Sequence, residues 1–427
     1  MNTLSKKQTE NAIAAAKALN AALSPLKILK SVAWPDEFRG QFLLHGKLPK
    51  PEYEAIDISV SLEGIKEARR HIDGDHVVMS WLSRVSDDVE TMADMVVARG
   101  TAEFTQHSQT LFGHPEKFLL DKKTRVIDLA HHMDATLEDL DIEKLVIAGY
   151  EKYMDAESFA GELRPLLGKH FGKNAPKLFI ADDLSAKAVA GSKRIRIRKT
   201  AEFSGRDVEQ LLQHEALIHV ATALNGRGQN NFPILGRAYS GVTEIQEGLA
   251  VFAEMISGAM DPSRFHRLAD RVIAIKMSLD GADFKEVFDF YEARTRTREE
   301  AYENTRRIFR GGLISGAAPF TKDMVYLNGL LRVHNFMRTI VKIGRADLIR
   351  LLFVGKLDLE DIPALAYLAD HGLIDGPKFM PPWAKDLRFL VSYLSYSAFL
   401  NSVKMPGFQK HYKEELAEVP VIWEEMG

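Results

Sequence analysis

The sequence contains no cysteine, and this absence excludes several kinds of site at once. None of its 427 residues carries a thiol, so disulfides, cysteine-ligated zinc, iron–sulfur clusters and thiol catalysis are excluded. An excess of charge of one sign is also missing, because 56 Lys and Arg residues stand against 59 Asp and Glu residues. Such a balance gives no electrostatic footprint for nucleic acid, and we predict no nucleic-acid partner.

Long apolar runs are absent as well. The longest late stretch without charge, residues 389–403, has 15 residues, four of them serine, whereas a membrane-spanning helix needs about 20 apolar residues. The N-terminal segment is rich in alanine and is interrupted by Glu10, so it lacks the continuous apolar segment of a secretory signal. We therefore expect a cytoplasmic protein that does not bind membranes.

Most of the chain has a helical pattern, and one short region has a strand pattern. Residues 177–181 read Lys-Leu-Phe-Ile-Ala, and residues 194–198 alternate arginine with Ile195 and Ile197. Alternation of this kind is typical of a strand with one buried face. We predict an α+β fold that is mostly helical, with a small antiparallel sheet between about residues 175 and 203.

Two helices should follow this sheet. Ser204 with Asp207 three residues later resembles a capping box, which places a helix start there, and Asn225-Gly226 gives it an end. Thr243 with Gln246 is a second capping box and predicts another helix start.

The first of these helices carries the motif His-Glu-x-x-x-His at residues 214–219. Residues i and i+4 of an α-helix lie about 40° apart, but i and i+5 lie about 140° apart. His214 and His219 can therefore bind one metal ion only if the helix absorbs one extra residue. We predict a π-bulge between them, since such bulges concentrate at functional sites.

The second helix offers the third ligand. Glu247 is followed by the small residues Gly248 and Ala250, which let this helix approach a neighbour closely. Two histidines and one glutamate leave a fourth zinc position for water, and Glu215 can act as the general base for that water. Glu254, two turns after Glu247, can orient one histidine.

Other patterns offer weaker candidates. Glu244 is the rival metal ligand, although a carboxylate in a first helical turn is favoured by the helix dipole alone. His71, Asp73, Asp75 and His76 lie within six residues, but Asp-Gly is also a common turn pair, and we predict a solvated turn. The pair His131-His132 is interpreted as part of a helix surface.

At this point the residues resemble a known family, the QEGLA-motif proteins, named for the run Gln246-Glu-Gly-Leu-Ala250. This family is related to the microtubule-associated tyrosine carboxypeptidases, zinc enzymes with the same His-Glu-x-x-x-His helix. Further similar patterns are Leu111-Phe-Gly-His-Pro115 and Phe320-Thr-Lys-Asp-x-x-Tyr-Leu-x-Gly329. The resemblance covers roughly residues 90–340 and extends to the rest of the chain.

The resemblance implies a zinc-dependent peptidase, expected to be a carboxypeptidase that acts on the C-terminus of a peptide or protein. His214, His219 and Glu247 would bind zinc, Glu215 would be the base, and the strand 195–198 would flank the cleft. A tubulin specificity is not implied. The chain would divide into an N-terminal extension (1–60), a helical N-terminal lobe (61–174) and a catalytic region with a helical C-terminal part (175–427).

A carboxypeptidase also needs a cation for the terminal carboxylate and a donor for the oxyanion. Arg307, Arg310 and Lys322 are the predicted cations, and a solvated basic surface is the alternative interpretation of them. Tyr326 is the predicted donor, with His334 and Tyr239 as alternatives.

Two other functions remain open. The chain could be a regulatory or binding protein with a retained metal site and no turnover, or an aminopeptidase or endopeptidase with the same metal chemistry. The sequence does not indicate an oligomeric state.

Overall fold

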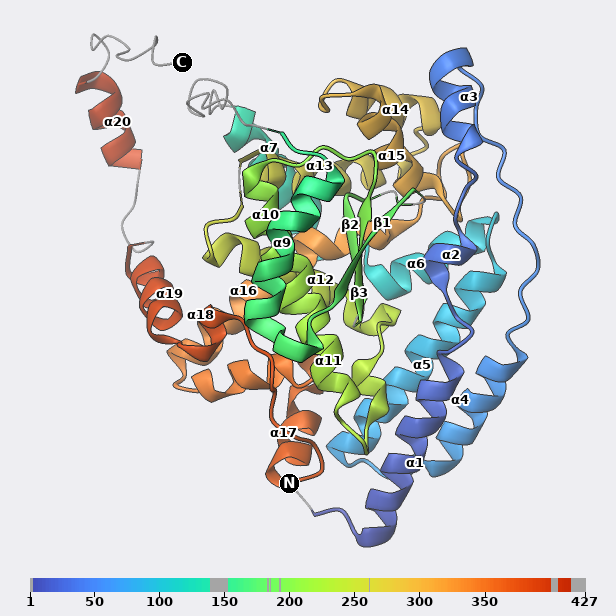
Figure 1. Cartoon of the computed structure of the whole chain (residues 1–427), viewed down its shortest axis with the longest axis vertical. Helices are drawn as coiled ribbons and strands as arrows, with labels where there is room; N and C mark the ends of the chain where they lie inside the picture. The colour runs from blue at the N-terminus through green and yellow to red at the C-terminus, as the bar shows by residue number, and fades with distance from the viewer. Residues whose placement is uncertain are drawn as a thin grey trace.

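Helices dominate the computed structural model, which describes residues 3–138, 153–400 except 183, 185, 192 and 261, and 406–415. Figure 1 shows one small sheet among them, which confirms the predicted α+β, mostly helical class. Before the sheet lie α1 (Lys6–Ala22), α2 (Ile28–Ser31), α3 (Glu37–His45), α4 (Ser59–His71), α5 (Val77–Val97), α6 (Ala102–Phe112), α7 (Val126–Glu138) and α9 (Ala156–Phe171).

The helices after the sheet carry the predicted site. They are α10 (Gly205–Leu211), a π-helical segment (Leu212–Val220), α11 (Ala221–Arg227), α12 (Ser240–Ile256), α13 (Pro262–Leu279), α14 (Phe284–Glu292), α15 (Arg298–Phe309), α16 (Met324–Lys342), α17 (Ile362–Asp370), α18 (Pro382–Lys385), α19 (Arg388–Leu400) and α20 (Pro406–Glu415). Short 3₁₀ turns span Gly172–Asn174, Pro233–Gly236, Thr321–Asp323, Ala346–Phe353 and Leu359–Asp361.

The sheet has three strands in the order β1-β3-β2. Strands β1 (Lys177–Ala181) and β3 (Arg194–Arg198) lie where the alternation predicts them, and β3 buries Ile195 and Ile197. The sheet is mixed rather than antiparallel throughout, because β1 runs parallel to β3 and only β2 (Ala188–Gly191) runs antiparallel to it. The unpredicted strand β2 reverses the chain between β1 and β3, and this reversal lets β3 run parallel to β1.

Helix α9 contains a proline. The conformation of a residue before proline is restricted, which predicts a helix break before Pro165, but α9 continues through that residue to Phe171. Its N-cap is Asp155, whose carboxylate accepts the Ser158 amide at 2.8 Å. The sequence pattern predicts helix over residues 136–167, and residues 139–152 of that range lie outside the described residues.

Two hydrophobic cores meet at the helix that bears the histidines. The larger core joins apolar residues from α1, α5, α12, α13 and α16, and the smaller one joins α9, β3 and the helix after Ser204. The π-helical segment gives Ile218 to the larger core and Ala216 and Leu217 to the smaller. The segment is therefore held from two sides. The boundaries at 60/61 and 174/175 stay predictions.

Helices α12 and α16 lie against each other in the middle of the molecule (Figure 1). A Cβ on Gly248 would lie 2.1 Å from the carbonyl carbon of Gly329. The two backbones therefore touch at this point, as the small residues after Glu247 predict. Within the described ranges, no helix has both the length and the apolar character to cross a bilayer.

We predict that Gly248→Ala destabilises the protein by about 3 kcal/mol, because a methyl group has no space between two backbones. Chemical denaturation with a chelator present measures this without any contribution from bound metal. Gly161→Ala is the matched control, since this exposed position in α9 has nothing within 4 Å of the new Cβ and alanine should add about 0.5–1 kcal/mol of stability. Equal stability of Gly248→Ala and the wild type would contradict the close contact.

Candidate metal centre

The helix that carries the histidines starts as predicted. Ser204 and Asp207 form the reciprocal capping box, in which the Asp207 carboxylate accepts the Ser204 amide at 2.8 Å. The second predicted helix start is wrong, because α12 begins one turn earlier, at Ser240. The Thr243 hydroxyl instead donates to the Tyr239 carbonyl at 2.9 Å inside the helix.

Between α10 and α11 the helix widens into π-helical turns over Leu212–Val220. A turn closed by i→i+5 hydrogen bonds takes one residue more than an α-helical turn. Residues five apart therefore return to the same face, and the rings of His214 and His219 have centroids 4.9 Å apart. The prediction of a widened helix between the two histidines is confirmed.

Both imidazoles meet the same carboxylate oxygen of α12. Glu247 Oε2 lies 3.3 Å from His214 Nε2 and 3.5 Å from His219 Nε2. Ligand atoms about 2.0–2.1 Å from a tetrahedral zinc ion lie roughly 3.3–3.4 Å from one another. The donors have the chemical types that zinc binds, both distances from Glu247 match this spacing, and all three ligand atoms lie within 4.8 Å of one another.

Glu254 contacts the nitrogen of His214 that does not face Glu247. Its carboxylate is fully buried and lies 2.6 Å from His214 Nδ1. Arg264 donates to both of its oxygens, at 3.0 and 3.1 Å, and Gln210 donates at 2.9 Å. A proton on Nδ1 fixes the tautomer of His214 and leaves Nε2 free to bind a metal.

The electrostatics of the group favour positive charge between the carboxylates. Burial alone would lower the pKa of His214, but Glu247 and Glu254 outweigh it and raise this pKa to about 10. Burial would raise the pKa of Glu247, yet His219 and His214 hold it well below its usual range. A divalent ion would supply the same positive charge while both imidazoles stay neutral.

Glu215, the predicted base, lies on the sheet side of the helix. Its Oε2 accepts the Ala190 backbone amide of β2 at 2.8 Å. Strand β3, which contains residues 195–198, lies in the middle of the sheet, and the edge strand β2 contacts Glu215. The expectation that residues 195–198 flank the cleft stays a prediction.

The alternative residues lie elsewhere. Glu244 is paired with Arg332 at 2.7 Å, so it does not join the histidines. His334 packs against Phe252 with ring centroids 6.2 Å apart. Tyr239 is buried, and burial together with Asp361 raises its pKa well above the usual value.

The predicted substrate-binding cations, Arg307, Arg310 and Lys322, have different partners. Arg307 donates to both oxygens of Asp323, at 2.7 and 2.8 Å, and to the Tyr326 hydroxyl at 3.4 Å. Lys322 Nζ lies 3.9 Å from Glu247 Oε1, which brings it beside the candidate metal ligands. Arg310 is buried over Phe320, and its Nε has no hydrogen-bond partner among the described residues. Their roles stay predictions.

Two nearby residues were missed by sequence reasoning. Lys356 is buried, and its Nζ donates to Gln246 Oε1 at 3.1 Å. Burial lowers its pKa to about 8, although Glu247 and Glu215 oppose that shift. Thr222 also donates to Gln246 Oε1, at 2.8 Å. Gln246 therefore links α12 to the histidine-bearing helix. Its position in the QEGLA motif was the sequence signal that could have identified this role.

A second group with ligand-type side chains is held by an arginine. Asp134, His266 and Asp270 bring their ligand atoms within 4.8 Å of one another. Arg294 lies 3.4 Å from Asp270 and 3.9 Å from Asp134, so the group is an ion-pair network that already has a cation.

The predicted solvated turn near residue 74 is a turn, with Gly74 at a φ of +86°. His71 pairs with Glu67 at 3.0 Å, and His76 accepts the Val78 amide at 3.2 Å. Within the part of the chain that the structure describes, these histidines join no metal-type cluster.

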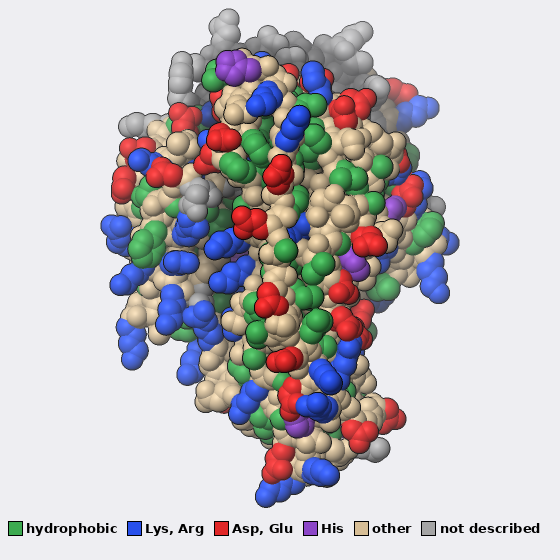
Figure 2. Space-filling view, turned by 90° about the vertical axis from the view of Figure 1, so that its right-hand side faces the viewer, with side chains coloured by type: hydrophobic (Ala, Val, Ile, Leu, Met, Phe, Trp, Pro, Cys, Tyr) green, Lys and Arg blue, Asp and Glu red, His purple; other side chains and the backbone are tan. Residues whose placement is uncertain are grey.

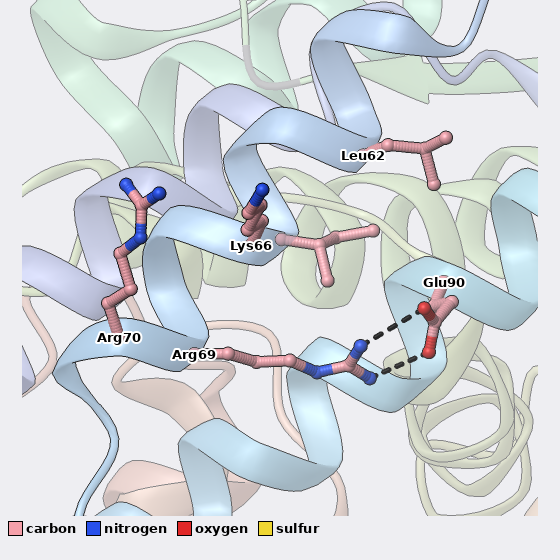
Figure 3. A pocket seen from close by; sticks show the side chains of 6 residues that line it. Leu62, Lys66, Arg69, Arg70 and Glu90 are labelled. Carbon is pink, nitrogen blue, oxygen red and sulfur yellow. Dashed lines mark hydrogen bonds and ion pairs between the residues drawn. The ribbon is translucent and has the colours of Figure 1, made fainter.

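The surface has two hollows lined by basic side chains. Figure 2 shows Lys and Arg side chains gathered around a hollow on one part of the surface. A separate hollow lies between α4 and α5, where Arg69 pairs with Glu90 at 2.7 Å (Figure 3). The lining of this second hollow includes Leu62, Lys66 and Arg70 but none of the candidate metal ligands.

The chain is similar to known proteins over most of its length. A model of the family described as microtubule-associated tyrosine carboxypeptidase matches residues 40–402. The Homo sapiens protein named Microtubule-associated tyrosine carboxypeptidase 1 is 26% identical over 251 residues, which are 55% of this chain and 46% of the human protein. The chain thus matches about half the length of that relative. Since the family match covers most of the chain and all candidate site residues, the chain belongs to the microtubule-associated tyrosine carboxypeptidase family.

Proposed function

We propose that this chain is a zinc-dependent carboxypeptidase. The observation that carries the proposal is the convergence of His214, His219 and Glu247 at the spacing of tetrahedral zinc ligands. Membership of a carboxypeptidase family supports hydrolysis at a C-terminus. The human relative's name specifies tyrosine, and we take tyrosine as the first terminal residue to test.

A bound zinc ion would acidify a water molecule and polarise the scissile carbonyl. Glu215 supplies the proton transfers: one carboxylate oxygen is held by Ala190, and the other can take a proton from the attacking water. The same oxygen then delivers the proton to the leaving amine. Lys322, whose Nζ is 3.9 Å from Glu247, would stabilise the tetrahedral oxyanion by its positive charge.

The sheet offers a path for the substrate chain. Strand β2 lies at its edge, so an extended peptide can pair with it beside Glu215. The neighbouring strand β3 carries Arg194, Arg196 and Arg198. Basic side chains close to the site would attract the carboxylate end of a peptide by electrostatic steering.

We predict that the purified protein carries about one zinc ion per chain and that His219→Ala loses it, because one of three protein ligands is removed. Glu254→Gln should weaken zinc binding by about 10–100-fold, since the amide no longer fixes the His214 tautomer as a carboxylate does. Metal analysis and chelator competition measure both effects.

Glu244→Gln is the control for the metal prediction. It changes a buried glutamate of the same helix, and we expect full zinc occupancy despite some loss of stability from the broken Arg332 pair. Wild-type protein that holds no zinc and takes none up would contradict the proposed site.

We predict that Glu215→Gln keeps its zinc and loses about 10²–10⁴-fold in the rate of hydrolysis, because an amide cannot take the proton of the water. Release of tyrosine from N-acetylated peptides, followed by mass spectrometry, measures the rate. Glu209→Gln is the matched control, since Glu209 is an exposed residue of the same helix and its loss should leave the rate unchanged.

The same assay separates the alternative functions. Removal of N-terminal residues from unblocked peptides would indicate an aminopeptidase, and internal cleavage would indicate an endopeptidase. Stoichiometric zinc without hydrolysis of any peptide in a C-terminal library would favour a binding protein with a retained metal site.

A further inference from the structure

Three cations surround the ring of Tyr326. The guanidinium carbon of Arg271 lies 4.1 Å from the ring centroid, Lys322 Nζ lies 5.6 Å away and the guanidinium carbon of Arg307 lies 6.0 Å away. Asp323 is the carboxylate beside them, and Arg307 takes both of its oxygens at 2.7 and 2.8 Å. The cluster therefore has more positive than negative charge.

Arg271 is the cation of this cluster with the longest contact to Asp323. Its Nε lies 3.8 Å from Asp323, beyond hydrogen-bond distance, and its side chain is 14% exposed. Its Nη1 is buried and has no hydrogen-bond partner among the described residues. Both oxygens of Asp323 already accept hydrogen bonds from Arg307, and a buried guanidinium N–H without a hydrogen-bond partner is destabilising. An anion from outside the chain would therefore complete this site.

The position of Arg271 relates it to the metal centre. Helix α13 carries both Arg264, which holds Glu254 behind His214, and Arg271, seven residues later. Seven residues are two helical turns, or about 10.5 Å along the axis. Lys322 connects the metal centre with the cation cluster, because its Nζ is 3.9 Å from Glu247 and also faces the Tyr326 ring.

A short terminal segment can cross this space, because only the Lys322 ammonium and the Tyr326 ring lie between Glu247 and Arg271 in this chain of contacts. One residue of extended chain spans about 3.3–3.6 Å, and a hydrogen-bond contact at each end adds about 3 Å. A peptide whose scissile carbonyl lies at the metal centre would therefore direct its terminal carboxylate towards the cation cluster around Tyr326.

We propose that Arg271 binds the terminal carboxylate of the substrate, and this inference rests on the proposed carboxypeptidase function. The guanidinium fork matches a carboxylate, and stacking on Tyr326 holds its plane in place. Arg307 is paired with Asp323. In this proposal it holds Asp323 in place and does not itself bind the substrate carboxylate, which revises its predicted role. Sequence reasoning missed Arg271 because α13 shows no motif around it.

The experiment measures binding, not turnover. The probes are an N-acetylated tetrapeptide of glycine and alanine that ends in tyrosine, as free acid and as amide, titrated into zinc-loaded Glu215→Gln protein by calorimetry. We expect the acid to bind at least tenfold more tightly than the amide. Adding Arg271→Gln should reduce this ratio to about twofold or less and leave the affinity for the amide unchanged.

Two further variants control the result. Arg69→Gln removes the same charge from a surface pair with Glu90 and should keep the tenfold ratio. Arg271→Lys keeps the positive charge but loses the planar guanidinium, and it serves as the test if Arg271→Gln fails to fold. It should lower the acid-to-amide affinity ratio at least threefold. A ratio that survives both Arg271 variants, or an equal loss of affinity for acid and amide, would overturn the proposal.

The outcome is separable from that of the proposed function. Hydrolysis by the wild type together with an unchanged ratio in the Arg271 variants would refute the carboxylate site alone. An acid preference that depends on Arg271, in a protein whose wild type hydrolyses no peptide, would refute the peptidase and support the carboxylate site.

Discussion

Two histidines five residues apart must face one carboxylate, and this requirement shapes the centre of the molecule. A regular α-helix would point them in divergent directions, but the π-helical turns over Leu212–Val220 bring both Nε2 atoms to Glu247. Such turns are intrinsically unfavourable and rare. They persist here because the same segment is packed on two sides, with Ile218 in the larger core and Leu217 in the smaller one.

The second constraint is the position of Glu247 relative to the π-helical turns. Its helix, α12, lies in backbone contact with α16 through Gly248 and Gly329, so the carboxylate is placed by a contact that leaves no space for adjustment. Gln246 adds a polar tie to Thr222 on the histidine-bearing helix. Packing and hydrogen bonding thus fix both sides of the candidate site before any metal binds, which is the preorganisation that catalysis requires.

Sequence reasoning reached the parts of this arrangement that depend on local pattern. The capping box at Ser204 and the buried alternation of Ile195 and Ile197 are local signals, and the need for a widened helix follows from counting residues per turn. Strand β2 was missed because Ala-Val-Ala-Gly has no alternation to detect. The start of α12 was misplaced because a threonine hydroxyl that bonds back to the preceding turn looks the same in sequence as a cap.

The charges could not be assigned from sequence because their partners come from distant elements. Arg307 and Asp323 are 16 residues apart and in different helical segments, and Arg264 reaches Glu254 from the next helix. Local sequence shows only that arginines are numerous near residues 306–310. Which of them is neutralised depends on tertiary placement: Asp323 takes Arg307 and Glu254 takes Arg264. Arg271 shares Asp323 with Arg307 and has the longer contact, 3.8 Å against 2.7 Å, so the chain's own ion pairs determine where an outside anion can bind.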